Sequence, residues 1–275
     1  MTNEISLTNE NKFFMVIDAA VNLPGVNIDR RSFLKKELSK YYDEETVLKA
    51  INTNPANAGI EINVIDNIAK ECINYETNKV SSLSALAGIP GGIAIIGTVT
   101  ADMAQYFVHI IRILQKLMYL YGWGDIFNEN VELDDAIKNQ LTLFIGVMFG
   151  VNRANSAVVK LAENVALNFK KSSINKALTK GAVYPVVKKI SGILGVKMTK
   201  QIFTKSISKI VPIFGGVVSG GLTYVTFKPS AIKLKNHLRT LPNADVNFYK
   251  QNVINNYNRN YYSSNIIDVE FNEVY

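Results

Sequence analysis

Two long uncharged stretches interrupt the amphipathic patterns of this chain. Val80 to Ala101 has 22 residues without a charge, and Ile210 to Phe227 has 18. Each contains proline and closely spaced glycines, and each is followed by apolar residues at helical spacing. We therefore expect an all-α fold, a single multi-helix bundle with two central glycine-rich apolar helices.

Shorter helices are predicted before the first stretch. Apolar spacing indicates a helix over Glu10–Val21. Asp29 is the expected N-cap of the next helix, Asp43 begins a third, and Asp134 begins a helix further along the chain. After the first stretch breaks at Pro90, a long helix is expected from about Gly92 to Tyr121.

A helix that starts near Glu61 should lead straight into the first uncharged stretch. Its apolar positions keep the helical period and should be buried: Ile62, Ile65, Ala69, Cys72 and Ile73. Its acids are expected on the outside: Asp66, Glu71 and Glu76.

The glycines and prolines of the uncharged stretches are interpreted as packing devices. Gly88 and Gly92 are four apart, a spacing that lets another backbone approach closely. A membrane-spanning helix needs about 20 apolar residues, and prolines and glycines favour burial inside protein or a hairpin that enters one leaflet. The residues assigned to helix packing or shallow insertion are Gly88, Pro90, Gly91, Gly92, Gly97, Pro212, Gly215, Gly216, Gly220 and Gly221.

A polar stripe follows the first stretch on the predicted long helix. Its residues share one helix face: Asp102, Gln105, His109, Arg112 and Lys116. One interpretation is an ordinary solvated stripe, and the other is a headgroup site or a buried polar seam. The chain lacks paired metal-ligand spacings and a phosphate-loop motif, so we expect no metal, nucleotide or other cofactor.

Charge is distributed unevenly along the chain. Residues 164–244 contain 14 Lys and Arg and no Asp or Glu. Such a block favours an anionic partner, and the lack of interleaved aromatics and reading motifs argues against nucleic acid. The expected contacts to anionic lipid are Lys170, Lys171, Lys176, Lys180, Lys188, Lys189, Lys197, Lys200, Lys205 and Lys209.

Composition and the ends of the chain add to this picture. Hydrophobic residues make up 48% and charged residues 19%, which makes membrane contact plausible. The first residues do not follow a secretory-signal pattern, and the single Cys72 fits a reducing compartment, so the cytoplasm is predicted. We expect a helical domain over 1–244 and an Asn- and Tyr-rich tail over 245–275, disordered or strand-like.

A family resemblance is carried by four features: the glycine-rich turn, the following aspartate, the long helix with arginine and the Tyr-Gly ending. These features are Gly92, Gly97, Asp102, Arg112 and Tyr121-Gly122, and with the segment IVPIFGGVVSGGLTYVTF they resemble the EcsC family of bacterial proteins. The likeness covers about 150 residues in two blocks between Glu76 and Arg239. The resemblance implies an all-helical protein without an established enzymatic activity, in a family whose founding member is encoded beside an ABC transporter.

Three functions remain open from the sequence. The leading one is a non-enzymatic protein on the inner face of the cell membrane that binds anionic lipid, as an accessory to a transporter or an envelope process. The second is a soluble module that encloses a lipid or another apolar ligand between the glycine-rich helices. The third is a hydrolase-like enzyme that uses Asp102, His109 and Arg112.

Overall fold

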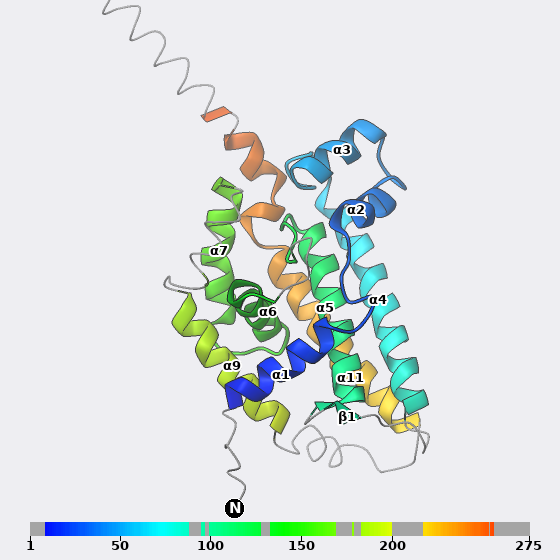
Figure 1. The fold of residues 1–275 in the computed structure, drawn as a ribbon. Coiled ribbons are helices and arrows are strands. Elements are labelled where there is room, and N and C mark those ends of the chain that lie inside the picture. Colours follow the sequence, from blue (N-terminus) through cyan, green and yellow to red (C-terminus); the bar gives the residue numbers. More distant parts are fainter. Residues whose placement is uncertain are drawn as a thin grey trace, which may run out of the picture.

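The computed structural model of this protein describes residues 9–87, 95–96, 99–127, 133–168, 178, 183–199, 217–252 and 254–255. These residues form an all-α bundle, as predicted, and their β structure is limited to one pair of two-residue strands (Figure 1). In chain order the elements are α1 (Asn9–Val21), α2 (Arg30–Leu38), α3 (Glu44–Asn52), α4 (Ile62–Ala87), β1 (Ile95–Ile96), β2 (Val99–Thr100), α5 (Ala101–Leu120), α6 (Asp135–Met148), α7 (Ala154–Asn168), α9 (Tyr184–Thr199), α11 (Val217–Leu238) and η1 (Pro242–Ala244).

The predicted N-cap at Asp29 is confirmed, and Asp43 and Asp134, which were expected to begin helices, are N-caps as well. The side chains of Asp29, Asp43 and Asp134 each accept a hydrogen bond from the backbone N–H three residues later, at 2.7–2.8 Å. Each bond satisfies a donor that the first helical turn would leave unpaired. The starts of α2, α3 and α6 are therefore determined locally by the sequence.

Helix α5 is the centre of the bundle, with α4 and α11 packed beside it and α1 and α6 on other sides (Figure 1). Asp66, near the start of α4, bonds to Tyr121 and Arg239, which lie just beyond the ends of α5 and α11. Helix α4 therefore runs antiparallel to both of its neighbours.

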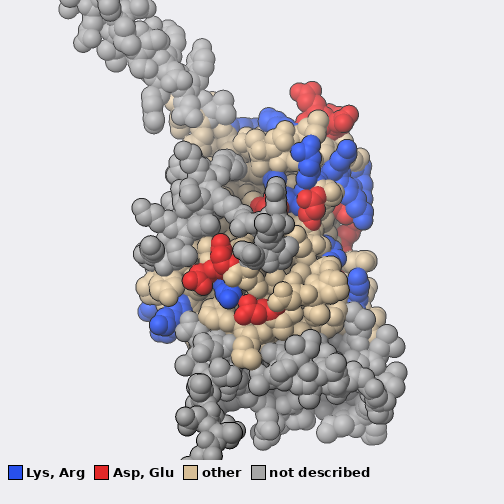
Figure 2. Space-filling model, in the orientation of Figure 1, with Lys and Arg blue, Asp and Glu red and all other residues tan. Residues whose placement is uncertain are grey.

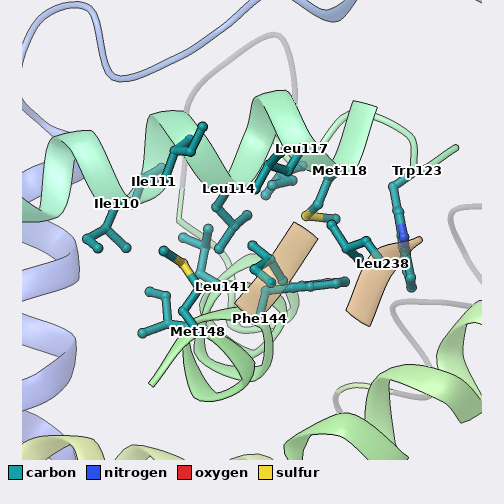
Figure 3. Packing of buried hydrophobic residues seen from close by; sticks show 14 of the residues in the cluster. Ile110, Ile111, Leu114, Leu117, Met118, Trp123, Leu141, Phe144, Met148 and Leu238 are labelled. Atoms are coloured by element: carbon teal, nitrogen blue, oxygen red, sulfur yellow. The ribbon is translucent and has the colours of Figure 1, made fainter. Parts of the chain in front are cut away.

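The apolar core surrounds α5. Every side chain from Tyr106 to Leu120 except Arg112 is buried. In Figure 3, Leu114 points at Leu141 of α6 and Met118 lies next to Leu238 of α11. Each such side chain contributes about 1.5–3 kcal/mol through burial, so α5 is held mainly by the hydrophobic effect.

The long helix begins later than predicted. Instead of continuing from Gly92, the described chain forms the antiparallel pair β1–β2, with Ile95 opposite Thr100 and Ile96 opposite Val99. All four residues are β-branched, which favours extended backbone over helix. The helix starts only at Ala101. Of the predicted packing residues, Gly88, Pro90, Gly91, Gly92 and Gly97 lie outside the described part.

The second uncharged stretch continues into one long helix. Helix α11 begins at Val217, within this stretch, and runs through Pro229 to Leu238. Gly220 and Gly221 lie within α11, whereas Pro212, Gly215 and Gly216 lie outside the described part. Within the described chain, none of the helices has both the length and the apolar character that crossing a membrane requires.

The fold extends past the predicted boundary at residue 244. Residues 246–252 are helical, and Tyr249 is buried. The Asn54 side-chain amide donates a 2.7 Å hydrogen bond to the Tyr249 hydroxyl. The first part of the predicted tail therefore belongs to the bundle, while the strand-like residues 267–271 lie outside the described part.

Gly122 ends α5 in a backbone conformation that favours glycine. Its φ is +87°, and the Trp123 N–H donates to the Met118 carbonyl at 2.9 Å, which closes a Schellman motif. A Cβ on Gly122 would lie 2.1 Å from the carbonyl oxygen of Asn243. The turn and the close approach of the chain near η1 both require the absence of a side chain.

We expect Gly122→Ala to lower the free energy of unfolding by about 1–3 kcal/mol, because of left-handed strain and overlap with Asn243. Gly124→Ala is the matched control, since a Cβ there meets nothing within 4 Å. Urea denaturation of both variants measures the difference. Equal stability of the two variants would contradict the assignment.

Candidate functional site

The predicted polar stripe of α5 faces α4. His109 is 1% and Lys116 8% exposed, and Gln105 and Arg112 are half-buried. The solvated-stripe interpretation is therefore wrong for His109 and Lys116, because α4 covers this face. Asp102 lies in the first turn of α5, and its side chain is outside the described part.

Three residues of the stripe meet at one carboxylate, that of Glu76 on α4. Its Oε1 accepts hydrogen bonds from Lys116 Nζ at 2.7 Å and from Arg112 Nε at 3.2 Å. Its Oε2 lies 2.7 Å from His109 Nδ1. Glu76 itself is fully buried. We call these four side chains the Glu76 network.

The ionisation of Glu76 follows from these partners. Burial alone would raise its pKa, but the hydrogen bond from His109 and the charges of Lys116 and Arg112 outweigh burial and lower the pKa to about 2. Glu76 is therefore a carboxylate at neutral pH. The other ring nitrogen of His109, Nε2, is buried and has no hydrogen-bond partner among the described residues.

The loop between α1 and α2 is attached to the same helix. Arg112 donates from Nη1 to the Gly25 carbonyl. Gln115, one turn before Tyr119, donates to the Val26 carbonyl at 2.8 Å and accepts from the Ile28 N–H at 2.9 Å. The network is thus connected to the surface at Gly25, which is exposed.

Asp66 forms a second polar cluster nearer the start of α4. It accepts from the Tyr121 hydroxyl at 2.6 Å and from Arg239 Nε at 2.7 Å, and it lies 3.2 Å from Lys235 Nζ. Burial raises the pKa of Asp66, but these partners outweigh it and lower the pKa below its usual value. This cluster joins α4 to α5 and α11.

Arg30 is a buried cation that binds backbone carbonyls. Its guanidinium donates to the carbonyls of Ile51, Thr53 and Trp123 at 2.7–3.2 Å, and to that of Ala50 at 3.4 Å. Desolvation lowers its pKa, and the charge of Asp125 opposes this shift. Arg30 holds the end of α3 against the turn after α5.

The structure gives no sign of nucleophilic or metal chemistry in its described residues. Cys72 is buried, as its place in the apolar period predicts, and desolvation raises the pKa of its thiol to about 12, which disfavours the reactive thiolate. Groups of three or more metal-ligating side chains are lacking within the described ranges. His109 and Arg112 converge on Glu76, a carboxylate other than the Asp102 assumed in the enzyme interpretation.

Two of the ten predicted lipid-contacting lysines can be placed by their side chains. Lys188 and Lys189 are exposed on α9. Lys197 belongs to α9, but its side chain is outside the described part, as are the remaining lysines: Lys170, Lys171, Lys176, Lys180, Lys200, Lys205 and Lys209.

The prediction that Glu76 lies on the outside of its helix is wrong, because its side chain is fully buried. The apolar period of α4 continues at the same spacing from Ala69 and Ile73 to Val80, and Glu76 lies between the last two on that buried face. That continued spacing is the signal that identifies it. For Arg30 and Gln115, which bind backbone carbonyls far away in the sequence, no local pattern indicates the role.

Replacing Glu76 should be costly. Glu76→Gln leaves Arg112 and Lys116 without their carboxylate, and we expect a loss of about 3–5 kcal/mol in the free energy of unfolding. Glu71→Gln, at an exposed acid of the same helix, should change it by less than about 0.5 kcal/mol. Urea denaturation at neutral pH compares the two; similar losses would contradict a structural role for the network.

The same carboxylate should make the free energy of unfolding depend on pH in the acid range. Its pKa is lowered from 4.5 to about 2 in the folded protein, so its stabilisation is complete above pH 4.5 and is lost as the pH falls towards 2. The loss is on the order of 3 kcal/mol. Unfolding free energies of the wild type and Glu76→Gln, measured across this range, should converge at the acid end. A constant difference would refute the assignment.

Comparison of the chain with models of protein families, with curated proteins and with solved structures finds no match. The resemblance to the EcsC family thus stays a prediction from the sequence motifs.

Proposed function

We propose that this protein is a non-enzymatic peripheral protein of the inner membrane surface that binds anionic lipid through its basic segment. The observation that carries the proposal is the run of residues 164–244, with 14 Lys and Arg and no acid. Each such side chain near an anionic leaflet contributes about 1 kcal/mol to binding. Within the described part, Asp66 pairs with two of them, Lys235 and Arg239, and its single negative charge offsets one of these two positive charges.

Helix α9 supports the proposal with an aromatic side chain beside lysines. Tyr184 is 41% exposed, and Lys188 and Lys189 follow about one turn later, both exposed. At the lower left of Figure 2, basic side chains lie over this helix. A tyrosine next to lysines is typical of helices at a membrane interface, where the ring enters the headgroup region.

Helix α11 presents a similar outer face. Its inner positions, Phe227, Ala231, Leu234 and Leu238, are buried in the bundle. Its outer positions include Val225 at 61% and Ile232 at 39% exposure. Lys228 and Lys233 lie next to them in the helix, and no acid interrupts the face. Exposed aliphatic residues flanked by lysines suit a surface that is both apolar and anionic.

The other end of the bundle has a different surface. Over α2, α3 and α4, acidic and basic side chains are interspersed at the upper right of Figure 2. On α3, for example, exposed Leu48 is accompanied by Glu44, Glu45 and Lys49. A surface of mixed sign attracts an anionic leaflet weakly, so the basic segment is the favoured contact.

Three helix ends lie together at one pole of the bundle. The end of α4, the start of α5 and the start of α11 lie together at the lower end of Figure 1. Both glycine-rich stretches connect to helices there. Together with the EcsC resemblance, this arrangement supports an accessory role beside a membrane transporter or in an envelope process.

The test removes charge from the segment. We expect a variant with Lys176, Lys180, Lys188 and Lys189 changed to Gln to bind phosphatidylserine-containing vesicles at least about a hundredfold more weakly than the wild type. A control removes the same charge elsewhere, at Lys35, Lys36, Lys49 and Lys70, and should bind nearly as the wild type does. Vesicle cosedimentation at several salt concentrations measures both.

Equal binding by the two variants would refute the electrostatic contact. Recovery of native protein only in the membrane-free fraction, with a co-purifying lipid, would favour the module that encloses an apolar ligand instead.

A further inference from the structure

The Glu76 network holds more positive than negative charge. Arg112 and Lys116 share the one carboxylate of Glu76, and among the described residues neither has another carboxylate within 4 Å. Buried charges in proteins are ordinarily matched by opposite charges. The network therefore carries one positive charge that is not balanced by a carboxylate among the described residues.

The two cations also keep unused hydrogen-bond donors. A guanidinium has five N–H groups and an ammonium three. Arg112 uses Nε for Glu76 and Nη1 for the Gly25 carbonyl. Among the described residues, Lys116 makes one hydrogen bond, 2.7 Å long, to Glu76. Their side chains keep 17% and 11% exposure, so both side chains reach the surface in part.

A third cation, Lys79, shares the ring of Tyr75 with Lys116. The ring of Tyr75, the residue before Glu76, is 56% exposed, and its centroid lies 5.0 Å from Lys116 Nζ and 5.9 Å from Lys79 Nζ. Lys79 is exposed and forms no ion pair within the described ranges. Cation–π attraction keeps both ammonium groups near the ring.

Nearby acids do not cancel this surplus. Besides Glu76, the acid that affects the pKa of nearby Cys72 is Glu37. Lys116 and Lys40 affect the same pKa, and Cys72 lies one turn before Glu76. Glu37 is already bound to Lys40. With the one carboxylate of Glu76 set against the cations of Arg112, Lys116 and Lys79, these four side chains carry a net charge of +2.

We propose that Arg112, Lys116 and Lys79, beside the ring of Tyr75, form a binding site for a phosphate group. A phosphate carries up to two negative charges and several acceptor oxygens, which match the surplus charge and the unused donors. The phosphate can be free or part of a lipid headgroup, and the chemistry of recognition is the same. The inference uses side chains outside residues 164–244 and does not depend on the membrane proposal.

The experiment is calorimetric titration of the full-length protein with inorganic phosphate at constant ionic strength, with chloride as the reference anion. We expect saturable phosphate binding that Lys79→Gln weakens about tenfold. Lys79 lies outside the network and is exposed, so this variant should fold normally. Lys70→Gln removes an exposed lysine of the same helix and is the matched control, expected to bind phosphate as the wild type does.

A second arm identifies the source of the phosphate. Binding to vesicles that contain phosphatidic acid should fall in Lys79→Gln relative to Lys70→Gln if the ligand is a headgroup, and should be equal in the two if it is free phosphate. The site is refuted if the wild type shows neither phosphate-specific heat nor a Lys79-dependent vesicle contact, or if both lysine variants lose binding equally. Loss of vesicle binding only in the lysine variant of residues 164–244 would support the membrane proposal. The titration with inorganic phosphate then shows whether the site at Lys79 binds free phosphate.

Discussion

The buried carboxylate of Glu76 determines how α4 and α5 are aligned. An ion in the interior is stable only when its partners lie at hydrogen-bond distance, and His109, Arg112 and Lys116 provide those partners over two turns of α5. Sliding α4 by one turn would remove all three contacts. Apolar packing alone would tolerate such a shift better, because leucine and isoleucine side chains contact one another in many arrangements.

The second carboxylate of α4 adds a constraint at another height. Asp66 and Glu76 are ten residues apart, which is about 15 Å along a helix. Asp66 bonds to Lys235 and Arg239 of α11 and its extension, as well as to Tyr121. Two ionic contacts at different heights fix both the position and the direction of α4 relative to its neighbours.

Local features of the fold could be predicted from the sequence, and the partners of each face could not. The helix starts at Asp29, Asp43 and Asp134 depend on contacts between residues three apart, and the core helix α6 depends on its own composition, which is uncharged after Lys138. The polar stripe of α5 was identified as one face, but which element covers it depends on the path of α4 and α11. The extended pair before α5 consists of β-branched residues, which favour strands. The long uncharged run around them predicts a helix instead, so the pair could not be foreseen from that run.

The contacts of α11 and the residues after it have a consequence for synthesis of the chain. Arg239 bonds to Asp66 across 173 residues of sequence, and Tyr249 bonds to Asn54 across 195. While a ribosome is still making the last third of the protein, the face of α4 that α11 later covers has no partner among these residues. Contacts this distant in sequence form slowly and leave apolar surface exposed in the meantime. A nascent chain of this protein is therefore expected to need protection from aggregation until its final helices emerge.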